Sequence, residues 1–203
     1  RVLEGGASVC RAAGIPIATG AAHALKIRGL PHLVACFFGD GAANRGPFLE
    51  GLNWAQVYQL PVLFVCEDNR ISATTPTAPM TAGSGSEARA QSMGVQGRTV
   101  DGNDVVAVHE AAQALIAEIR AGGGPRFLHA VTYRFKGHVS VDTAPYRDPA
   151  EVAAAKLHDP LIQARAKLLA MGAASAELDA VDAVAREEIQ SALAQAEAAP
   201  WPA

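Results

Sequence analysis

Residues 33–41 read Leu33-Val34-Ala35-Cys36-Phe37-Phe38-Gly39-Asp40-Gly41, so an apolar run ends abruptly in a Gly-Asp-Gly turn. A second apolar run, residues 62–66, ends shortly before Asn69. Short apolar runs bounded by glycine, proline and polar residues are typical of buried strands in a parallel sheet. Because the carboxyl ends of parallel strands meet at one edge of the sheet, we expect Asp40 and Asn69 to lie close together.

These two polar side chains suggest a cation site that also receives phosphate. A carboxylate and an amide oxygen are hard ligands, which suit magnesium or calcium. Gly39 and Gly41 let the backbone turn sharply and come close to an anionic group. The same residues also fit an ordinary turn and an ordinary strand end, so the pattern by itself leaves both interpretations open.

The rest of the chain alternates between strand and helix patterns. Besides the two apolar runs, strands are expected at residues 98–100 and 126–132. Helices are expected at residues 16–28, 47–59, 86–93, 105–120, 151–171 and 175–196, with a long loop over residues 70–86. This alternation predicts an α/β fold, a parallel sheet with helices on both faces.

Several segments resemble, in the same order, the alpha subunit of the thiamine-diphosphate-dependent 2-oxoacid dehydrogenases, the family of pyruvate, branched-chain 2-oxoacid and acetoin dehydrogenases. They are residues 39–46, 51–53, 60–62, 67–70, 100–104 and 132–138. The resemblance implies a thiamine-diphosphate-binding fold. It also implies that residues 1–149 form an amino-terminally truncated cofactor-binding domain. The change to alanine, glutamate, lysine and leucine at helical spacing after Pro149 predicts that residues 150–203 form helices packing on that domain or on a partner subunit.

The resemblance also implies the residues of the site. Magnesium would be bound by Asp40, by the side-chain oxygen of Asn69 and by the backbone carbonyl of Ile71, and would bridge to the diphosphate. Backbone N–H groups of Gly41 and Ala42 would receive phosphate oxygens, as the amino termini of helices commonly do.

His138 lies in an aperiodic stretch after the last predicted strand. In the family, the histidine at this position contacts the diphosphate and helps to dock the substrate or the lipoyl group. Imidazole suits such a catalytic role because its charge can change near neutral pH. The alternative is an ordinary histidine on a surface loop.

The activity that the resemblance implies is an oxidoreductase that decarboxylates pyruvate or a branched-chain 2-oxoacid. The acyl group then passes to the lipoyl group of a transacylase partner. In the family, the glutamate that activates thiamine diphosphate comes from the beta subunit of an α2β2 heterotetramer. Glu67, beside the proposed metal ligands, is therefore expected to be structural.

Two other functions stay open. The loop Ala73-Thr74-Thr75-Pro76 resembles the acetoin dehydrogenases, which share the cofactor and the site. A non-catalytic subunit that retains the fold as an interaction partner is the other possibility. Spacing back from Asp40 favours it, because Arg11 falls where family members have a small apolar residue against the aminopyrimidine ring.

Composition limits the remaining classes. Half of the 203 residues are hydrophobic, enough to bury the core of one domain, and a net charge of -3 gives no electrostatic reason to expect nucleic acid or an anionic membrane as partner. Cys10, Cys36 and Cys66 lie far apart, and the last two lie inside apolar runs, which favours reduced thiols. We therefore expect a cytoplasmic protein, or a mitochondrial matrix protein in a eukaryote.

Overall fold

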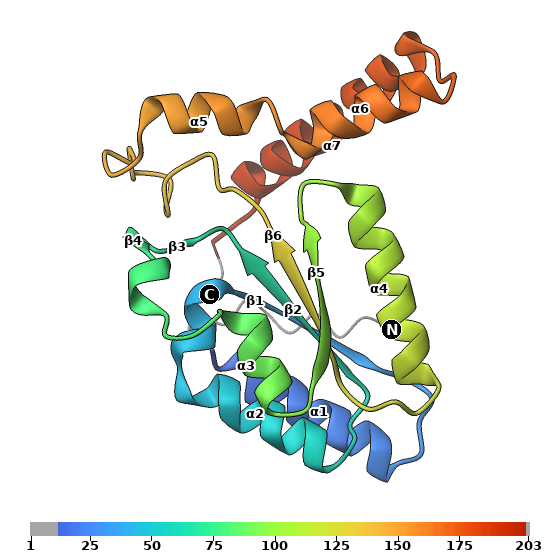
Figure 1. Cartoon of the computed structure of the whole chain (residues 1–203). Coiled ribbons are helices and arrows are strands. Elements are labelled where there is room, and N and C mark those ends of the chain that lie inside the picture. The colour runs from blue at the N-terminus through green and yellow to red at the C-terminus, as the bar shows by residue number, and fades with distance from the viewer. Residues whose placement is uncertain (1–11, 202–203) are drawn as a thin grey trace. The chain divides into compact units, whose positions relative to one another are not determined.

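The structure is a computed structural model, and it describes residues 12–201. Its centre is a four-stranded parallel sheet in the order β1-β2-β6-β5, built from β1 (Val34–Gly39), β2 (Val62–Asp68), β5 (Gln96–Asp101) and β6 (Arg126–Val131) (Figure 1). Gly39 pairs with Glu67, while Asp68 and Asp101 both pair with Val131. All four carboxyl ends are therefore level at one edge, and the predicted parallel sheet is confirmed.

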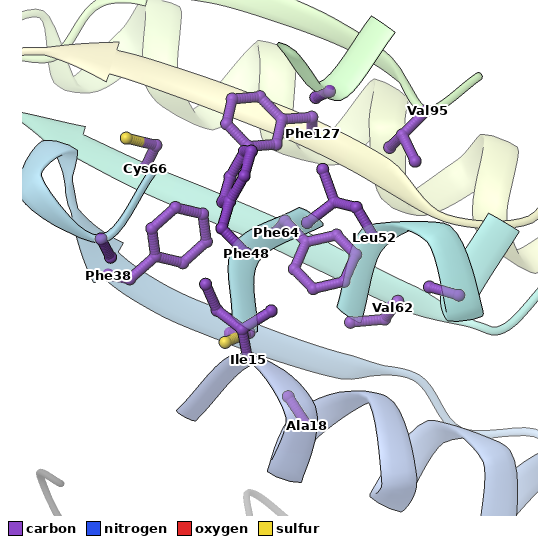
Figure 2. Packing of buried hydrophobic residues seen from close by; sticks show 14 of the residues in the cluster. Ile15, Ala18, Phe38, Phe48, Leu52, Val62, Phe64, Cys66, Val95 and Phe127 are labelled. Atoms are coloured by element: carbon purple, nitrogen blue, oxygen red, sulfur yellow. The ribbon is translucent and has the colours of Figure 1, made fainter. Parts of the chain in front are cut away.

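Three helices cover one face of the sheet: α1 (Gly14–Ile27), α2 (Gly46–Val57) and α3 (Ser86–Ser92). Aromatic side chains dominate this core (Figure 2). The ring of Phe48 from α2 contacts those of Phe38 and Phe127 edge-on, with centroids 5.8 and 6.1 Å apart. Phe64 of β2 is also fully buried. Close packing of this core against one face of the sheet thus fixes the strands that end near Asp40 and Asn69.

The other face is covered by α4 (Val105–Arg120), whose bounds are those predicted. Its buried residues Ala111, Leu115 and Ile119 belong to a cluster with Leu63, Val65 and Leu128 of the sheet. The side chain of Asp104 caps the helix by accepting hydrogen bonds from the backbone of Val106 and Ala107. Helices on both faces of the sheet are therefore confirmed.

Two predicted segments differ from the structure. The expected loop 70–86 contains a short antiparallel pair, β3 (Ile71–Ser72) and β4 (Thr75–Pro76), and a 3₁₀-helix, η2 (Ala78–Met80). The expected single helix 151–171 was wrong, because it consists of α5 (Pro149–Lys156) and α6 (Pro160–Ala170). Pro160 has no N–H to continue a helix, and Asp159 starts the new one by accepting a hydrogen bond of 2.8 Å from the backbone of Leu161.

The chain divides into two compact units, and the second begins at Asp159. Within the second unit, Arg165 of α6 pairs with Asp179 of α7 (Ser175–Ala198) at 2.6 Å. Glu177 accepts a hydrogen bond from the backbone N–H of Ala174, so α7 has an acidic residue three positions after its cap. How the carboxyl-terminal helices pack on the domain or on a partner stays a prediction.

Cys36 and Cys66 are buried free thiols, and burial raises their pKa to about 11 and about 12. They are therefore protonated core residues at neutral pH. Cys10 and Arg11 lie outside the described residues. Within residues 12–201, none of the helices has the length and apolar character needed to span a membrane.

Candidate functional site

Asp40 is the buried acid at the end of β1. It begins the 3₁₀-helix η1 (Asp40–Asn44), and its Oδ2 accepts a hydrogen bond of 2.7 Å from the hydroxyl of Thr77. Burial raises the pKa of Asp40, the Thr77 hydrogen bond opposes that rise, and the negative charge of Asp68 adds to it. A nearby cation would favour the ionised form of this carboxyl group.

Gly41, in η1, lies directly against Ser72 of β3. A Cβ atom on Gly41 would lie 2.3 Å from the hydroxyl oxygen of Ser72, so only glycine lets β3 pack against the turn at this distance. The neighbouring Ile71 donates its backbone N–H to Oδ1 of Asn69 at 3.1 Å. The segment that carries Asp40 therefore lies against the segment that carries Asn69 and Ile71.

Long-range contacts from the residues after β4 hold η1 in place. Arg89 of α3 donates to the backbone carbonyl of Ala43 at 2.7 Å and to the side chain of Asn44 at 2.6 Å. Asn44 in turn donates to the hydroxyl of Thr81 at 2.8 Å. No side chain caps the start of η1 at Gly39. Thr77, Thr81 and Arg89 were missed from the sequence, because each lies far from Asp40 along the chain.

A second acid, Asp68, lies at the end of β2 and pairs with His129 of β6, with 2.8 Å between Oδ2 and Nε2. The hydrogen bond to His129 lowers the pKa of Asp68 against the effect of burial. The other ring nitrogen of His129 is 3.0 Å from the hydroxyl of Thr99, which contacts the carboxylate of Glu87. No sequence pattern points to this chain of contacts, because it depends on β6 lying between β2 and β5.

His138 is exposed, on a loop that polar side chains hold together. Asp142 Oδ2 accepts hydrogen bonds of 2.7 Å from the backbone N–H of His138 and from the hydroxyl of Tyr146. Arg134 lies 3.4 Å from Nδ1 of His138 and donates to the carbonyl of Ala73 at 2.6 Å. The backbone hydrogen bond from His138 is the largest cause of the lowered pKa of Asp142. Through Arg134, the His138 loop is therefore tied to the segment that follows Asn69.

A cleft of about 570 Å³ opens at the carboxyl edge of the sheet. Asn69 and Ile71 line it, together with residues from the ends of β5 and β6 and from α5. Asp40, Gly41, Ala42 and His138 are not among the residues that line it. The structure thus brings Asp40 and Gly41 against the Asn69 segment and ties His138 to that segment, but it does not gather all the predicted site residues in one cavity.

The chemical types of the predicted ligands suit a hard cation. Within residues 12–201, no group of three or more His, Cys, Asp or Glu side chains could hold a metal ion. The predicted set is of another kind, because it combines the carboxylate of Asp40, the amide oxygen of Asn69 and the main-chain carbonyl of Ile71. Such a set suits magnesium, which commonly takes one or two carboxylates and completes its shell with phosphate oxygens and water.

Comparison with known proteins gives matches along nearly the whole chain. The family model described as dehydrogenase E1 component matches residues 4–203. The alpha subunit of acetoin:2,6-dichlorophenolindophenol oxidoreductase from Cupriavidus necator is 41% identical over 199 residues, which is 97% of this chain and 60% of that protein. The alpha subunit of the pyruvate dehydrogenase E1 component from Zymomonas mobilis is 38% identical, over 94% of this chain and 54% of that protein. The chain therefore spans little more than half the length of these relatives.

Proposed function

Because the chain belongs to the dehydrogenase E1 component family, we propose that it acts as part of the alpha subunit of a thiamine-diphosphate-dependent dehydrogenase. The proposed reaction is the decarboxylation of pyruvate or a branched-chain 2-oxoacid, with transfer of the acyl group to a lipoyl carrier. The close approach of Gly41 to Ser72, the residue after Ile71, supports this proposal most directly.

In this proposal the strand ends hold the cofactor by its diphosphate. Asp40, Asn69 and the carbonyl of Ile71 bind Mg²⁺, and the backbone N–H groups of Gly41 and Ala42 bind phosphate oxygens. Thr77 orients the Asp40 carboxylate through its hydrogen bond at 2.7 Å. Bound thiamine diphosphate supplies an electron sink for the decarboxylation.

His138 has the proposed catalytic role. Its backbone is held by Asp142 and its ring lies beside Arg134, while the side chain stays exposed. An exposed imidazole on a loop whose backbone is held in place can bind a phosphate oxygen or move a proton near neutral pH. Asp142 and Arg134 would position this loop without touching the substrate.

The proposed assembly is an α2β2 heterotetramer with a beta subunit, served by a lipoyl-bearing transacylase. The cytoplasm, or the mitochondrial matrix in a eukaryote, is the proposed location. Acetoin is the second candidate substrate, because the relative from Cupriavidus necator is named for acetoin. Relatives named for pyruvate cover a similar share of the chain, so the matches do not separate the two substrates.

The test uses the whole protein assembled with its beta subunit. Calorimetric titration with thiamine diphosphate should show binding that requires Mg²⁺, and Asp40→Ala should abolish that binding. Glu110→Ala, which removes an exposed carboxylate on α4, is the matched control and should bind normally. Unchanged affinity in Asp40→Ala would remove this site from the proposal.

The same assembly separates binding from catalysis. We expect His138→Ala to keep the affinity for thiamine diphosphate and to lose acyl transfer to a lipoyl acceptor. Full turnover by this variant would exclude His138 from the reaction. Assays on pyruvate, branched-chain 2-oxoacids and acetoin, run side by side, identify the substrate, and absence of turnover on all of them would support the non-catalytic alternative.

A further inference from the structure

Arg147 is a buried cation whose side chain has no hydrogen-bond acceptor within residues 12–201. Only 7% of the residue is exposed, and its three side-chain nitrogens have no hydrogen-bond partner in the described part of the chain. The guanidinium carbon lies 4.4 Å from the centre of the Tyr133 ring. The hydroxyl of Tyr133 is also buried without a partner among the described residues.

Burial of this charge is unfavourable as it stands. A guanidinium group has five N–H donors in a planar fork, and a desolvated charge that lacks a partner is strongly disfavoured. The face of the Tyr133 ring offsets part of that penalty, but an aromatic ring accepts none of the in-plane N–H bonds. An anion with two oxygens in one plane is the partner that a guanidinium fork matches best.

Arg147 and Tyr133 both line the 570 Å³ cleft at the carboxyl edge of the sheet. Most of its lining residues are polar or charged, and the apolar ones among them are Ile71, Pro76, Val131 and Ala155. A cavity of this size in which several polar groups converge can hold a small polar ligand.

The other charges in the cleft restrict the ligand. The two acids that line it, Asp101 and Glu151, are offset by Arg70 and Arg147, and the imidazole of His158 is also part of the lining. A dianion such as phosphate would add more negative charge than one guanidinium offsets. We propose that this cleft binds a small monocarboxylate, whose two oxygens pair with the guanidinium of Arg147.

Such a ligand would also act on the His138 loop. Tyr146, the residue before Arg147, donates its hydroxyl to Asp142 at 2.7 Å and lies 3.3 Å from Arg134. Asp142 holds the backbone of His138. A carboxylate that holds Arg147 in place therefore stabilises residues 138–146. Asn69 and Ile71, two of the proposed metal ligands, line the cleft as well, but Asp40 does not, so acetate binding can be measured separately from cofactor binding.

The experiment measures acetate binding to the whole protein without thiamine diphosphate or metal, by saturation-transfer NMR. We expect saturable binding that Arg147→Gln weakens by at least about tenfold, because the charge-assisted pair is lost. Arg120→Gln, which removes an exposed arginine at the end of α4, is the matched control and should bind acetate normally. Acetate should also slow amide exchange in residues 138–146.

Two further variants test the inference independently of Arg147→Gln. Ala155→Leu fills the cleft while leaving Arg147 in place, so it should weaken acetate binding even if Arg147→Gln does not fold. Asp40→Ala should bind acetate normally, which separates this inference from the proposed function. The inference is overturned if acetate shows no saturable binding, if both cleft variants bind it as tightly as the unmodified protein, or if phosphate displaces bound acetate at a lower concentration than acetate itself needs to bind.

Discussion

The two parts of the candidate site are held in place in different ways. Asp40 and Asn69 follow β1 and β2, so backbone pairing between parallel strands places them. His138 lies on a loop in which Asp142, Arg134 and Tyr146 make the contacts. The first part therefore inherits the rigidity of the core, whereas the second depends on a few polar hydrogen bonds near the surface.

The rigid strand-end part is suited to anchoring a cofactor, and the loop part is suited to movement. A diphosphate anchor benefits from rigid ligands, because oxygen atoms that are already in place lose little entropy on binding. A histidine that meets a substrate benefits from a loop that can open and close. The four predictions below break or sharpen this contrast between the strand-end part, around Asp40 and Asn69, and the loop part, around His138.

Loss of a core side chain beneath the strand-end part should have the largest effect on stability. Phe64→Ala empties a fully buried position in β2, and we expect the free energy of unfolding to fall by about 3–5 kcal/mol. Denaturant titration of the whole protein measures this loss. Phe37→Ala is the control, because Phe37 is 66% exposed on β1 and its loss should cost less than about 0.5 kcal/mol. Equal losses for the two variants would contradict the packing scheme.

Adding one methyl group should disturb the strand-end part more gently. In Gly41→Ala, the new Cβ would lie 2.3 Å from the hydroxyl oxygen of Ser72 and 2.8 Å from its Cβ, so β3 must move away. We expect a cost of about 1–3 kcal/mol in the free energy of unfolding. Ser72→Gly removes both clashing atoms, so the double variant should recover most of that loss relative to Ser72→Gly alone. Additive losses would show that the contact with Ser72 is not what requires glycine.

The same contrast explains what the sequence could predict. The apolar runs before Asp40 and Asn69 predicted two parallel strands, and the helical pattern over residues 105–120 predicted α4 with the bounds that the structure has. Local pattern suffices there, because strand and helix formation follow from burial and capping. The break at Pro160 was missed although proline gave the signal, since the alanine-rich pattern on both sides suggested one helix.

Contacts that join distant segments could not be predicted from the pattern. Thr77 reaches Asp40 from 37 positions away, and His129 reaches Asp68 from 61 positions away. The first contact requires the path of the β3-β4 segment, and the second requires that β6 lies beside β2. Among the described residues, the side chain of Arg147 has no hydrogen-bond partner. This depends on how the whole loop packs, which no periodic pattern in the sequence indicates.

Removing the acid of the loop should loosen the loop part alone. Asp142→Ala deletes the acceptor for the backbone of His138, the backbone of Ala144 and the hydroxyl of Tyr146. We expect amide exchange in residues 138–146 to become roughly tenfold faster, while β1 and β2 exchange as before. Hydrogen exchange followed by mass spectrometry makes the comparison within one sample. Faster exchange in the strands as well would show that the two parts are coupled.

Lowering the pH should change the stabilising contributions of Asp142 and Asp40 in opposite directions. This is the smallest of the four predicted effects. The pKa of Asp142 is lowered by its hydrogen bonds, so its stabilising effect is complete above the ordinary value of 3.8 and is lost as the pH falls through the lower, folded-state pKa.

The pKa of Asp40 is raised, chiefly by burial, so the protonated form is favoured in the fold. The stabilisation of the fold by protonated Asp40 is complete below pH 3.8 and is lost as the pH rises through the higher, folded-state pKa. Carboxyl NMR titration of the metal-free protein should therefore find Asp40 titrating above 3.8 and Asp142 below it. Asp68→Asn should lower the pKa of Asp40, because it removes a neighbouring negative charge, and should leave Asp142 unchanged. If both acids titrate on the same side of pH 3.8, burial at the strand end and hydrogen bonding in the loop do not shift the two pKa values in opposite directions.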